Sequence, residues 1–296
     1  RIDSYDTING SSTTNMTLAS GATINVDADE VTHMLADETA GRLTISDQKI
    51  TVTNEITVDT ANLLDATTTG VVTASIDTSE TVDELNTLTS TNNAYTIVIS
   101  EVDATGSTAA EYNTINNATT VAVDLTNVTA LAASSLSDLG TLATAITNNE
   151  FTNDTGLTTI AVSDTTIDAT TLATRIDSFD TINGNSTTDM TLASGATINV
   201  DADEVTHMLA DETAGRLTIS DQVITVTNAI TVDTANLLGA TTTGVVTATI
   251  ATTETVTELA TLNADGGTNA LTIVIRSQDA TGATAAQLNT INDATS

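Results

Sequence analysis

The fold of this chain is decided by a stretch that occurs twice. Arg1-Ile2-Asp3-Ser4-Tyr5-Asp6-Thr7-Ile8-Asn9-Gly10 returns as Arg175-Ile176-Asp177-Ser178-Phe179-Asp180-Thr181-Ile182-Asn183-Gly184. The same offset still holds at Val71, which matches Val245. Self-similarity over so long a span marks an architecture built from copies of one unit, and it has to be interpreted before any local pattern.

The copies set the domain boundaries that we expect. Near Ala264 the second copy gains two residues, so that Thr96 matches Thr272. Residues 1–174 therefore form a first long repeat, and residues 175–296 form a second, truncated one. The first residue is not Met, and the sequence stops where the first copy continues, so we expect both ends to lie within a longer protein.

A shorter and looser repeat lies inside the long one. Runs such as Leu43-Thr-Ile-Ser and Thr96-Ile-Val-Ile-Ser alternate apolar and polar side chains, which is the period of a half-buried strand. Their spacing of about 24 to 37 residues is typical of solenoids. The runs begin near Thr17, Leu43, Val71, Thr96, Val121, Thr158, Thr191, Leu217, Val245 and Thr272.

Many of these runs are followed by a stretch with helical spacing, such as residues 27–35 and 79–88. Within the second stretch Val82, Leu85 and Leu88 lie three residues apart and share one helix face. An Asp, Ser or Thr opens each stretch, as a helix N-cap requires. The pattern therefore predicts a repeated order of strand, turn and helix. We call one strand, with the connection and the helix that follow it, a rung.

Rungs of this kind cannot bury an apolar face alone, so we expect them to stack. The predicted fold is a β-rich, right-handed parallel β-solenoid with short helices in the rungs, an α/β-solenoid. About six rungs fall in residues 1–174 and about four in residues 175–296, in one continuous solenoid. The chain has no Pro, as stacked central strands require. The alternative is a row of tandem β-sandwich domains.

Composition excludes several classes of function. The 39 acidic and 6 basic residues give a formal charge of −33, which repels nucleic acid and anionic lipid. No apolar run approaches the roughly 20 residues that span a bilayer, so we expect no membrane insertion in this segment. With no Cys there is no thiol nucleophile or cysteine-ligated metal, and we expect no cofactor, although calcium remains possible.

Differences between the copies indicate which side chains face inward. Tyr95 and Tyr112 become Leu271 and Leu288, so apolar bulk is kept while the hydroxyl is lost, and Tyr5 becomes Phe179 in the same way. Charge is lost at five other positions, which we therefore expect to be solvated surface. They are Lys49, Glu55, Asp65, Asp77 and Asp83, which become Val223, Ala229, Gly239, Ala251 and Thr257.

Two acidic clusters are the candidate metal ligands. Carboxylates at nearby positions can supply the oxygen ligands that calcium prefers. The spacing lacks the glycine and the distal glutamate of an EF-hand loop, and helix capping explains the same residues. The clusters are Asp27, Asp29 and Glu30, and Asp201, Asp203 and Glu204.

His33 and His207 are the only histidines, and each lies in the same helical stretch of its copy. A histidine with Asp37 or Glu38 one turn away has the makings of a general base. We favour a histidine on a solvated helix surface, because nearly identical copies carry the residue along. We identify no Ser–His–Asp arrangement, and we expect no catalytic residue.

Several phrases resemble a known family. Thr69-Gly-Val-Val-Thr-Ala, Thr81-Val-Asp-Glu-Leu-Asn-Thr-Leu-Thr, Asp103-Ala-Thr-Gly-Ser-Thr-Ala-Ala-Glu and Asp168-Ala-Thr-Thr-Leu-Ala-Thr are similar to repeats of giant cyanobacterial cell-surface proteins. These include the swimming-associated surface protein and haemolysin- or adhesin-like giants. The resemblance covers essentially the whole chain, and it implies a very long, extracellular, repeat-built protein.

The sequence thus favours a structural function, not an enzyme. We expect a segment of a surface fibre or filament, at the cell surface, whose partners are further copies of its own repeats, side by side or end to end. Two alternatives stay open: a calcium-dependent adhesin module, and a polysaccharide-acting β-solenoid enzyme, for which no basic, aromatic-lined cleft is evident. Thr-x-Thr runs such as Thr51-Val-Thr53 also occur in ice-binding arrays, but rungs of unequal length would not keep such an array in register.

Overall fold

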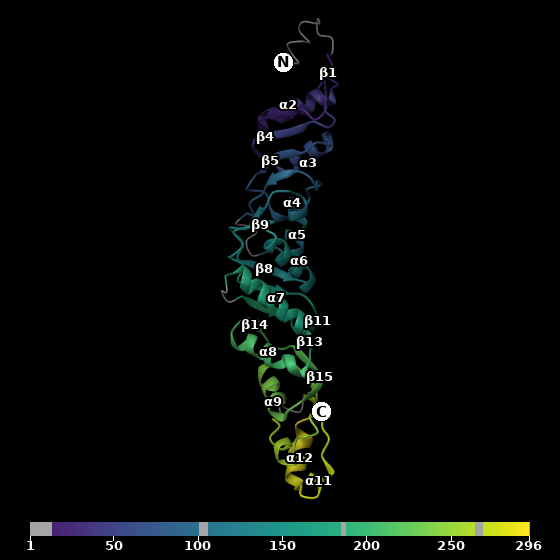
Figure 1. Ribbon diagram of the computed structural model, residues 1–296, viewed down its shortest axis with the longest axis vertical. Coiled ribbons are helices and arrows are strands. Elements are labelled where there is room, and N and C mark those ends of the chain that lie inside the picture. The colour runs from purple at the N-terminus through teal and green to yellow at the C-terminus, as the bar shows by residue number, and fades with distance from the viewer. Residues whose placement is uncertain (1–13, 101–105, 185–187, 264–268, 296) are drawn as a thin grey trace. The chain divides into compact units, whose positions relative to one another are not determined.

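The computed structural model describes residues 14–100, 106–184, 188–263 and 269–295, and its elements are labelled in Figure 1. The chain divides into two compact units. The first comprises residues 1–129 and 144–156, and the second comprises residues 130–143 and 157–296. In the described residues of both units, strands and helices alternate along the chain, so the fold class is mixed α/β.

The first unit begins with short strands and the helices that follow them. Its elements are β1 (Met16–Thr17), β2 (Thr23–Val26), α2 (Ala28–Thr39), β3 (Leu43–Thr44), β4 (Lys49–Ile56), α3 (Val58–Thr67), β5 (Val72–Ile76), α4 (Val82–Leu85), β6 (Ala94–Thr96), α5 (Ala109–Asn117), β7 (Val123–Asp124) and β9 (Phe151–Thr152). Helix α6 (Leu136–Thr147) contributes residues to both units.

The main sheet of the first unit follows the order of the chain. Its strands are arranged β2-β4-β5-β6, and every pairing is parallel. Strands β1 and β3 form a second parallel pair, and β7 and β9 a third. Parallel neighbours need a crossover connection, and the helices α2, α3 and α4 lie in those crossovers.

The second unit repeats this pattern with more strands. Its elements are β8 (Ala130–Ser134), β10 (Thr159–Val162), β11 (Thr166–Asp168), α7 (Ala169–Ile182), β12 (Asp189–Leu192), β13 (Thr197–Val200), α8 (Ala202–Thr213), β14 (Leu217–Thr218), β15 (Val223–Ile230), α9 (Val232–Thr241), β16 (Val246–Ile250), α10 (Val256–Leu259), β17 (Ala270–Thr272), α11 (Ser277–Ala280) and α12 (Ala285–Asp293).

Two parallel sheets make up the second unit. One has the order β14-β12-β10-β8, and the other has the order β11-β13-β15-β16-β17. The strand pairs recorded for the described residues are parallel throughout, and none of these sheets closes into a barrel. The predicted class, α/β with parallel sheets, is therefore confirmed, whereas the antiparallel sheets of tandem β-sandwiches are not what these strands form.

The sequence repeat is also a repeat of structure. Strand β2, helix α2 and strand β4 recur as β13, α8 and β15, each 174 residues later, and α3 recurs as α9. After the two inserted residues the register is unchanged, because Thr73 pairs with Ala94 as Thr247 pairs with Ala270. The insertion lies in the connection between α10 and β17 and leaves the strand pairing untouched.

The core is made of the alternate, inward-facing residues of the strands and one face of each helix. Val82, Leu85 and Leu88 are all buried, as their spacing predicted. The largest completely buried side chains include Tyr95, Tyr112 and Phe179.

The inward-facing positions inferred from the copies are confirmed for Tyr95, Tyr112, Phe179 and Leu271. The prediction was wrong for Leu288, the counterpart of Tyr112, which is 41% exposed. Tyr5 lies outside the described residues.

Where a strand begins, a threonine hydroxyl bonds to the residue before the neighbouring strand, and a glycine allows the two segments to approach closely. Thr68 lies buried before β5 and donates to the carbonyl oxygen of Gln48 before β4, at 2.6 Å. Gly70 lies so close to Gln48 that an added Cβ would be 2.4 Å from the same oxygen, so glycine is required there. The second copy repeats the contact, with Thr242 donating to Gln222 at 2.6 Å.

Most described helix starts are capped by a side chain, as the sequence predicted, and α11 is an exception. Among the described residues, four helices carry a complete capping box, in which a threonine and a residue three positions later bond reciprocally to each other's backbone N–H. The pairs are Thr81 with Glu84, Thr108 with Glu111, Thr255 with Glu258, and Thr284 with Gln287.

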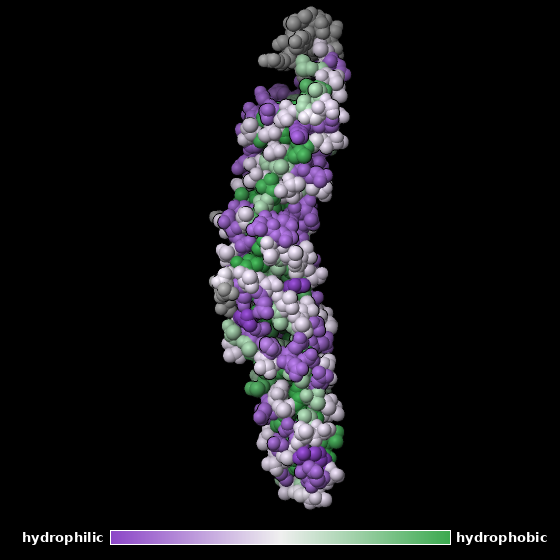
Figure 2. Space-filling view, in the orientation of Figure 1, coloured by the Kyte–Doolittle hydropathy of each residue, from purple (hydrophilic) through white to green (hydrophobic). Residues whose placement is uncertain are grey.

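The visible surface is mostly hydrophilic or intermediate in hydropathy, with small hydrophobic areas between (Figure 2). Lys49, Glu55 and Asp83 are exposed, as expected from their loss in the second copy, whereas Asp65 and Asp77 are half-buried. In the part of the chain that the structure describes, no helix is both long and apolar enough to cross a membrane.

Candidate functional site

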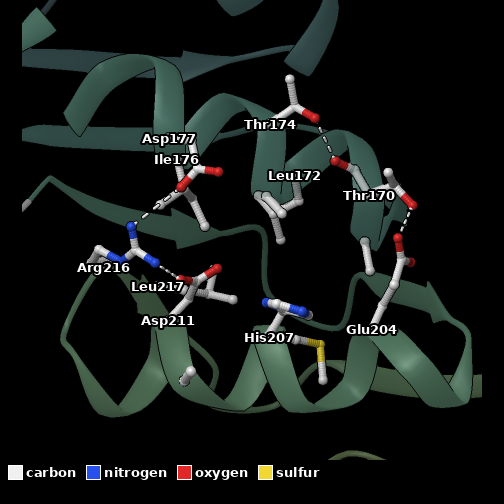
Figure 3. Close-up of a pocket in the computed structure, with 14 residues that line it drawn as sticks. Thr170, Leu172, Thr174, Ile176, Asp177, Glu204, His207, Asp211, Arg216 and Leu217 are labelled. Atoms are coloured by element: carbon white, nitrogen blue, oxygen red, sulfur yellow. Dashed lines mark hydrogen bonds and ion pairs between the residues drawn. The ribbon is translucent and has the colours of Figure 1, made fainter. Parts of the chain in front are cut away.

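A cavity of about 220 Å³ lies between α7 and α8 of the second unit (Figure 3). Its floor is apolar, because Leu172 and Ile176 of α7 and Met208 of α8 are buried there. Its rim is polar and charged. The residues that line it are Ala169, Thr170, Leu172, Ala173, Thr174, Ile176, Asp177, Glu204, His207, Met208, Ala210, Asp211, Arg216 and Leu217.

Both helices are held at their starts by aspartates. Asp168 caps α7 by accepting from the Thr171 N–H at 2.9 Å. Asp201 caps α8 by accepting from the N–H groups of Asp203 at 2.9 Å and Glu204 at 3.0 Å. These caps fix where each helix begins and therefore which side chains face the cavity.

Arg216 binds three carboxylates at one end of the cavity. Figure 3 shows its pairs with two of them, Asp177 and Asp211. Its Nη1 lies 2.8 Å from Asp180 Oδ2 and 3.3 Å from Asp177 Oδ1. Its Nη2 forms an ion pair with Asp211, whose side chain is only 7% exposed. The guanidinium fork presents several N–H donors in fixed directions, which suits it to bind more than one carboxylate.

The buried carboxyl of Asp211 depends on this arginine. Burial raises the pKa of Asp211, because removal from water disfavours the charged form, and Arg216 acts in the opposite direction. Asp180 also accepts from the N–H of Thr188 at 3.0 Å, so the cluster extends from α7 into the connection before β12. The arginine thus joins α7, α8 and the residues that follow each helix.

His207 rises from α8 toward the space between the helices (Figure 3). Beside it, Glu204 accepts a hydrogen bond from the hydroxyl of Thr170 on α7. His207 itself is exposed, and so is its counterpart His33 on α2. Their placement is that of solvated helix-surface histidines.

The predicted calcium ligands lie at helix starts. Asp27 caps α2 by accepting from the Glu30 N–H at 2.9 Å, and Asp201 has the same role in α8. Asp29 and Glu30 are exposed in the first turn of α2, where negative charge favours the helix dipole. In the part of the chain that the structure describes, no three His, Asp or Glu side chains are grouped to hold a metal ion.

The described residues of the first copy include one pair of the same cluster. Arg42 pairs with Asp37 as Arg216 pairs with Asp211. Asp3 and Asp6, the counterparts of Asp177 and Asp180, lie outside the described residues.

A second polar cluster lies in the first unit, between α3 and the turn before β6. The buried amide of Asn93 donates to Asp65 at 2.9 Å and to the Tyr95 hydroxyl oxygen at 2.8 Å, and accepts from the Val72 N–H at 2.8 Å. Burial raises the pKa of Tyr95, so its hydroxyl remains protonated, and it donates to the Ala61 carbonyl at 3.3 Å. The prediction that Asp65 is simple solvated surface was therefore wrong.

The second copy shows which part of that cluster the fold requires. Asp65 and Tyr95 become Gly239 and Leu271, but Asn93 is kept as Asn269, whose side chain accepts from the Val246 N–H at 3.0 Å. The asparagine-to-strand bond is thus common to both copies, and the aspartate and tyrosine are additions to it. A pair of residues that can be lost together is not a shared catalytic site.

The charged side chains of these clusters have bonding partners within the protein. In the cavity, Arg216 is engaged by aspartates and Glu204 by a threonine, so their geometry ties elements together. Single-sequence patterns missed the arginine cluster because its members lie up to 39 residues apart. One signal was available: Arg42 and Asp37 are kept as Arg216 and Asp211, while many other charges change.

Comparisons of the chain with protein-family models, curated proteins and solved structures found no match.

Proposed function

We propose that this chain is a structural segment of an extracellular, repeat-built surface fibre, in which the rungs stack as one right-handed parallel β-solenoid. The observation that carries the proposal is strand order. In the longest sheets the strands follow one another in the order of the chain, β2-β4-β5-β6 and β11-β13-β15-β16-β17. Each strand thus uses its backbone groups on the rungs before and after it, which is how a solenoid propagates.

The proposed work of such a segment is mechanical. Parallel ladders and buried threonine bonds between neighbouring rungs resist separation, and an acidic surface keeps fibres hydrated and apart. The formal charge of −33 supports this acidic surface. The carboxylates that the structure engages serve as helix caps, as partners in ion pairs or as acceptors of hydrogen bonds within the fold. The resemblance to giant cyanobacterial surface proteins supports the extracellular location, which protease treatment of intact cells would test.

Small-angle scattering of the full chain tests the solenoid. We expect an asymmetric pair-distance distribution with a long tail. A chain lengthened by one further 174-residue copy should show a longer maximum dimension and an unchanged cross-section. A symmetric distribution with a radius of gyration near the roughly 19 Å of a compact globule of this length would contradict the proposal.

A further inference from the structure

Residues 97–99 and 273–275 have the same sequence, Ile-Val-Ile, and follow β6 and β17 at equivalent positions. In the first unit this segment is covered by a further strand. Val98 forms a parallel bridge with Asp124, whose N–H donates to the Ile97 carbonyl at 2.9 Å. The Ile99 N–H donates to the Asp124 carbonyl at 3.0 Å.

The covering strand is held by its side chains as well. Val123 and Leu125 flank Asp124 and are buried, so the strand alternates inward, outward, inward. The Asn127 side chain donates to the Ile99 carbonyl at 2.8 Å. Ile97 and Ile99 are completely buried as a result.

In the second unit the same apolar segment is open. Val274 is 54% exposed, and Ile273 and Ile275 are half-buried. Leu288 of α12 is 41% exposed, whereas its counterpart Tyr112 is completely buried.

The end of the described chain is already held beside this edge. Thr295 bonds both the N–H and the carbonyl of Leu271, each at 2.9 Å, as Thr119 bonds Tyr95. In the first copy the chain passes from Thr119 directly into the covering strand.

We infer that the edge at residues 273–275, together with Leu288, is a docking surface for one further parallel strand with the chemistry of residues 121–127. The incoming strand places an Asp opposite Val274, apolar residues on either side of that Asp facing the core, and an Asn three residues after it on the Ile275 carbonyl. Strand addition to an open sheet edge supplies backbone hydrogen bonds, and the flanking pockets supply specificity.

A rung of this kind fits better than a second copy of the chain. Strands β1 and β2, the first described strands, correspond to β12 and β13, which pair in the second unit with β10 and β11. The edge that a second copy would offer is therefore complementary to residues 159–168, not to residues 273–275. The inference rests on the proposed function, because it names the partner that a stacked rung would accept.

The test is hydrogen exchange on the full chain extended after Ser296 by a copy of residues 121–156. We expect exchange at residues 273–275 to slow by about tenfold or more relative to the unextended chain. Residues 97–99 of the same molecule provide the protected reference. As a control, the substitution Asp124→Pro is made in the appended copy and not in the original one. It removes the N–H that would donate to the Ile273 carbonyl, and it should restore fast exchange.

Two results would overturn the inference: unchanged exchange at residues 273–275 in the extended chain, or protection of these residues in the unextended chain that rises with protein concentration. The second would identify another copy of the chain as the occupant. Scattering from the same extended chain separates this failure from failure of the proposed function. An elongated particle without new protection leaves the fibre proposal standing, whereas a compact globule removes it.

Discussion

The hydroxyl of Thr68 donates a 2.6 Å hydrogen bond to the main-chain oxygen of Gln48, 20 residues earlier in the chain. The same hydroxyl accepts from the Gly70 N–H at 2.9 Å. One buried side chain thus links the entries of two neighbouring strands, and Thr242 does so again in the second copy. The threonine-rich composition, which looks monotonous in the sequence, therefore includes positions with specific structural roles.

Replacing this hydroxyl should weaken the fold measurably. Thr68→Val leaves the Gln48 oxygen and the Gly70 N–H without this partner, and a buried polar group without a hydrogen bond costs about 1 to 3 kcal/mol. Thr73→Val, at an exposed position of β5, is the matched control and should change the free energy of unfolding by less than about 0.5 kcal/mol. Urea denaturation measures both. Equal stabilities would show that the hydroxyl has no structural role.

The close approach of Gly70 to Gln48 makes a second prediction. Gly70→Ala places a Cβ 2.4 Å from the Gln48 oxygen, so the strands must separate, at a cost of about 1 to 3 kcal/mol. At Gly106 an added Cβ would meet no atom within 4 Å, and Gly106→Ala should be close to neutral. Thermal unfolding of the two variants gives the comparison. A Gly70→Ala protein as stable as Gly106→Ala would refute the contact.

Removal of Arg216 should destabilise the second unit through Asp211. Arg216→Met leaves a carboxylate whose side chain is 7% exposed without its cation. We expect a cost of about 2 to 3 kcal/mol, below the value for a fully buried pair because Arg216 is 30% exposed. Adding Asp211→Asn should recover part of the loss, since the uncompensated charge is then gone. No recovery in the double variant, measured by denaturant unfolding, would mean that Arg216 acts through packing alone.

Substitutions at the capping aspartates separate capping from calcium binding. Asn caps helices as well as Asp does but lacks the charge, so Asp27→Asn with Asp201→Asn should keep the stability of the wild type. The corresponding Ala variants should each lose about 1 kcal/mol. Melting with and without millimolar calcium completes the test. A calcium-dependent shift in the wild type that the Asn variant loses would establish these residues as ligands.

The capping boxes make the stability depend on pH in a defined direction. The Thr81 N–H and hydroxyl lower the pKa of Glu84 from its ordinary value of 4.5, and Thr255 does the same for Glu258. A carboxyl with a lowered folded-state pKa stabilises the protein above the unfolded value, and this contribution is lost as the pH falls through the folded value.

The difference between wild type and the variant Glu84→Gln with Glu258→Gln should therefore be largest near neutral pH and shrink below pH 4.5. Gln is a fair substitute, because Gln287 already completes the box of α12. The free energy of unfolding of both proteins is measured at a series of pH values. Taking the difference between the two removes the electrostatic repulsion that both proteins share. A difference that does not change with pH would contradict the assigned role.

Periodicity predicted many of the elements but not their lengths, and it did not predict β8 or α6. The strands expected near Leu43, Val71 and Thr158 are present as β3, β5 and β10, and the helix expected from Asp27 is present as α2. Some are shorter than their sequence runs, because partners decide where a ladder ends. Residues 97–99 continue the alternation of β6, yet only Val98 pairs, through one bridge to Asp124.

The cavity between α7 and α8 was not predictable in the same way. At one end of it, Arg216 pairs with Asp177 and Asp180, which belong to a different rung from Arg216. Its formation depends on how two helices pack, and packing is not encoded in the spacing of a single helix. By contrast the caps at Asp27 and Asp201 are local, so the sequence predicted them from a few neighbouring residues.

The two residues inserted between α10 and β17 have a consequence for how such a gene can change. Thr247 still pairs with Ala270 as Thr73 pairs with Ala94, so a change of length in this connection leaves the pairing register of the strand that follows it, β17, intact. Unequal recombination between nearly identical coding segments creates errors of this kind. If such changes of length fall in the connections between helices and strands, a protein can gain or lose whole repeats during evolution while every intermediate sequence still folds.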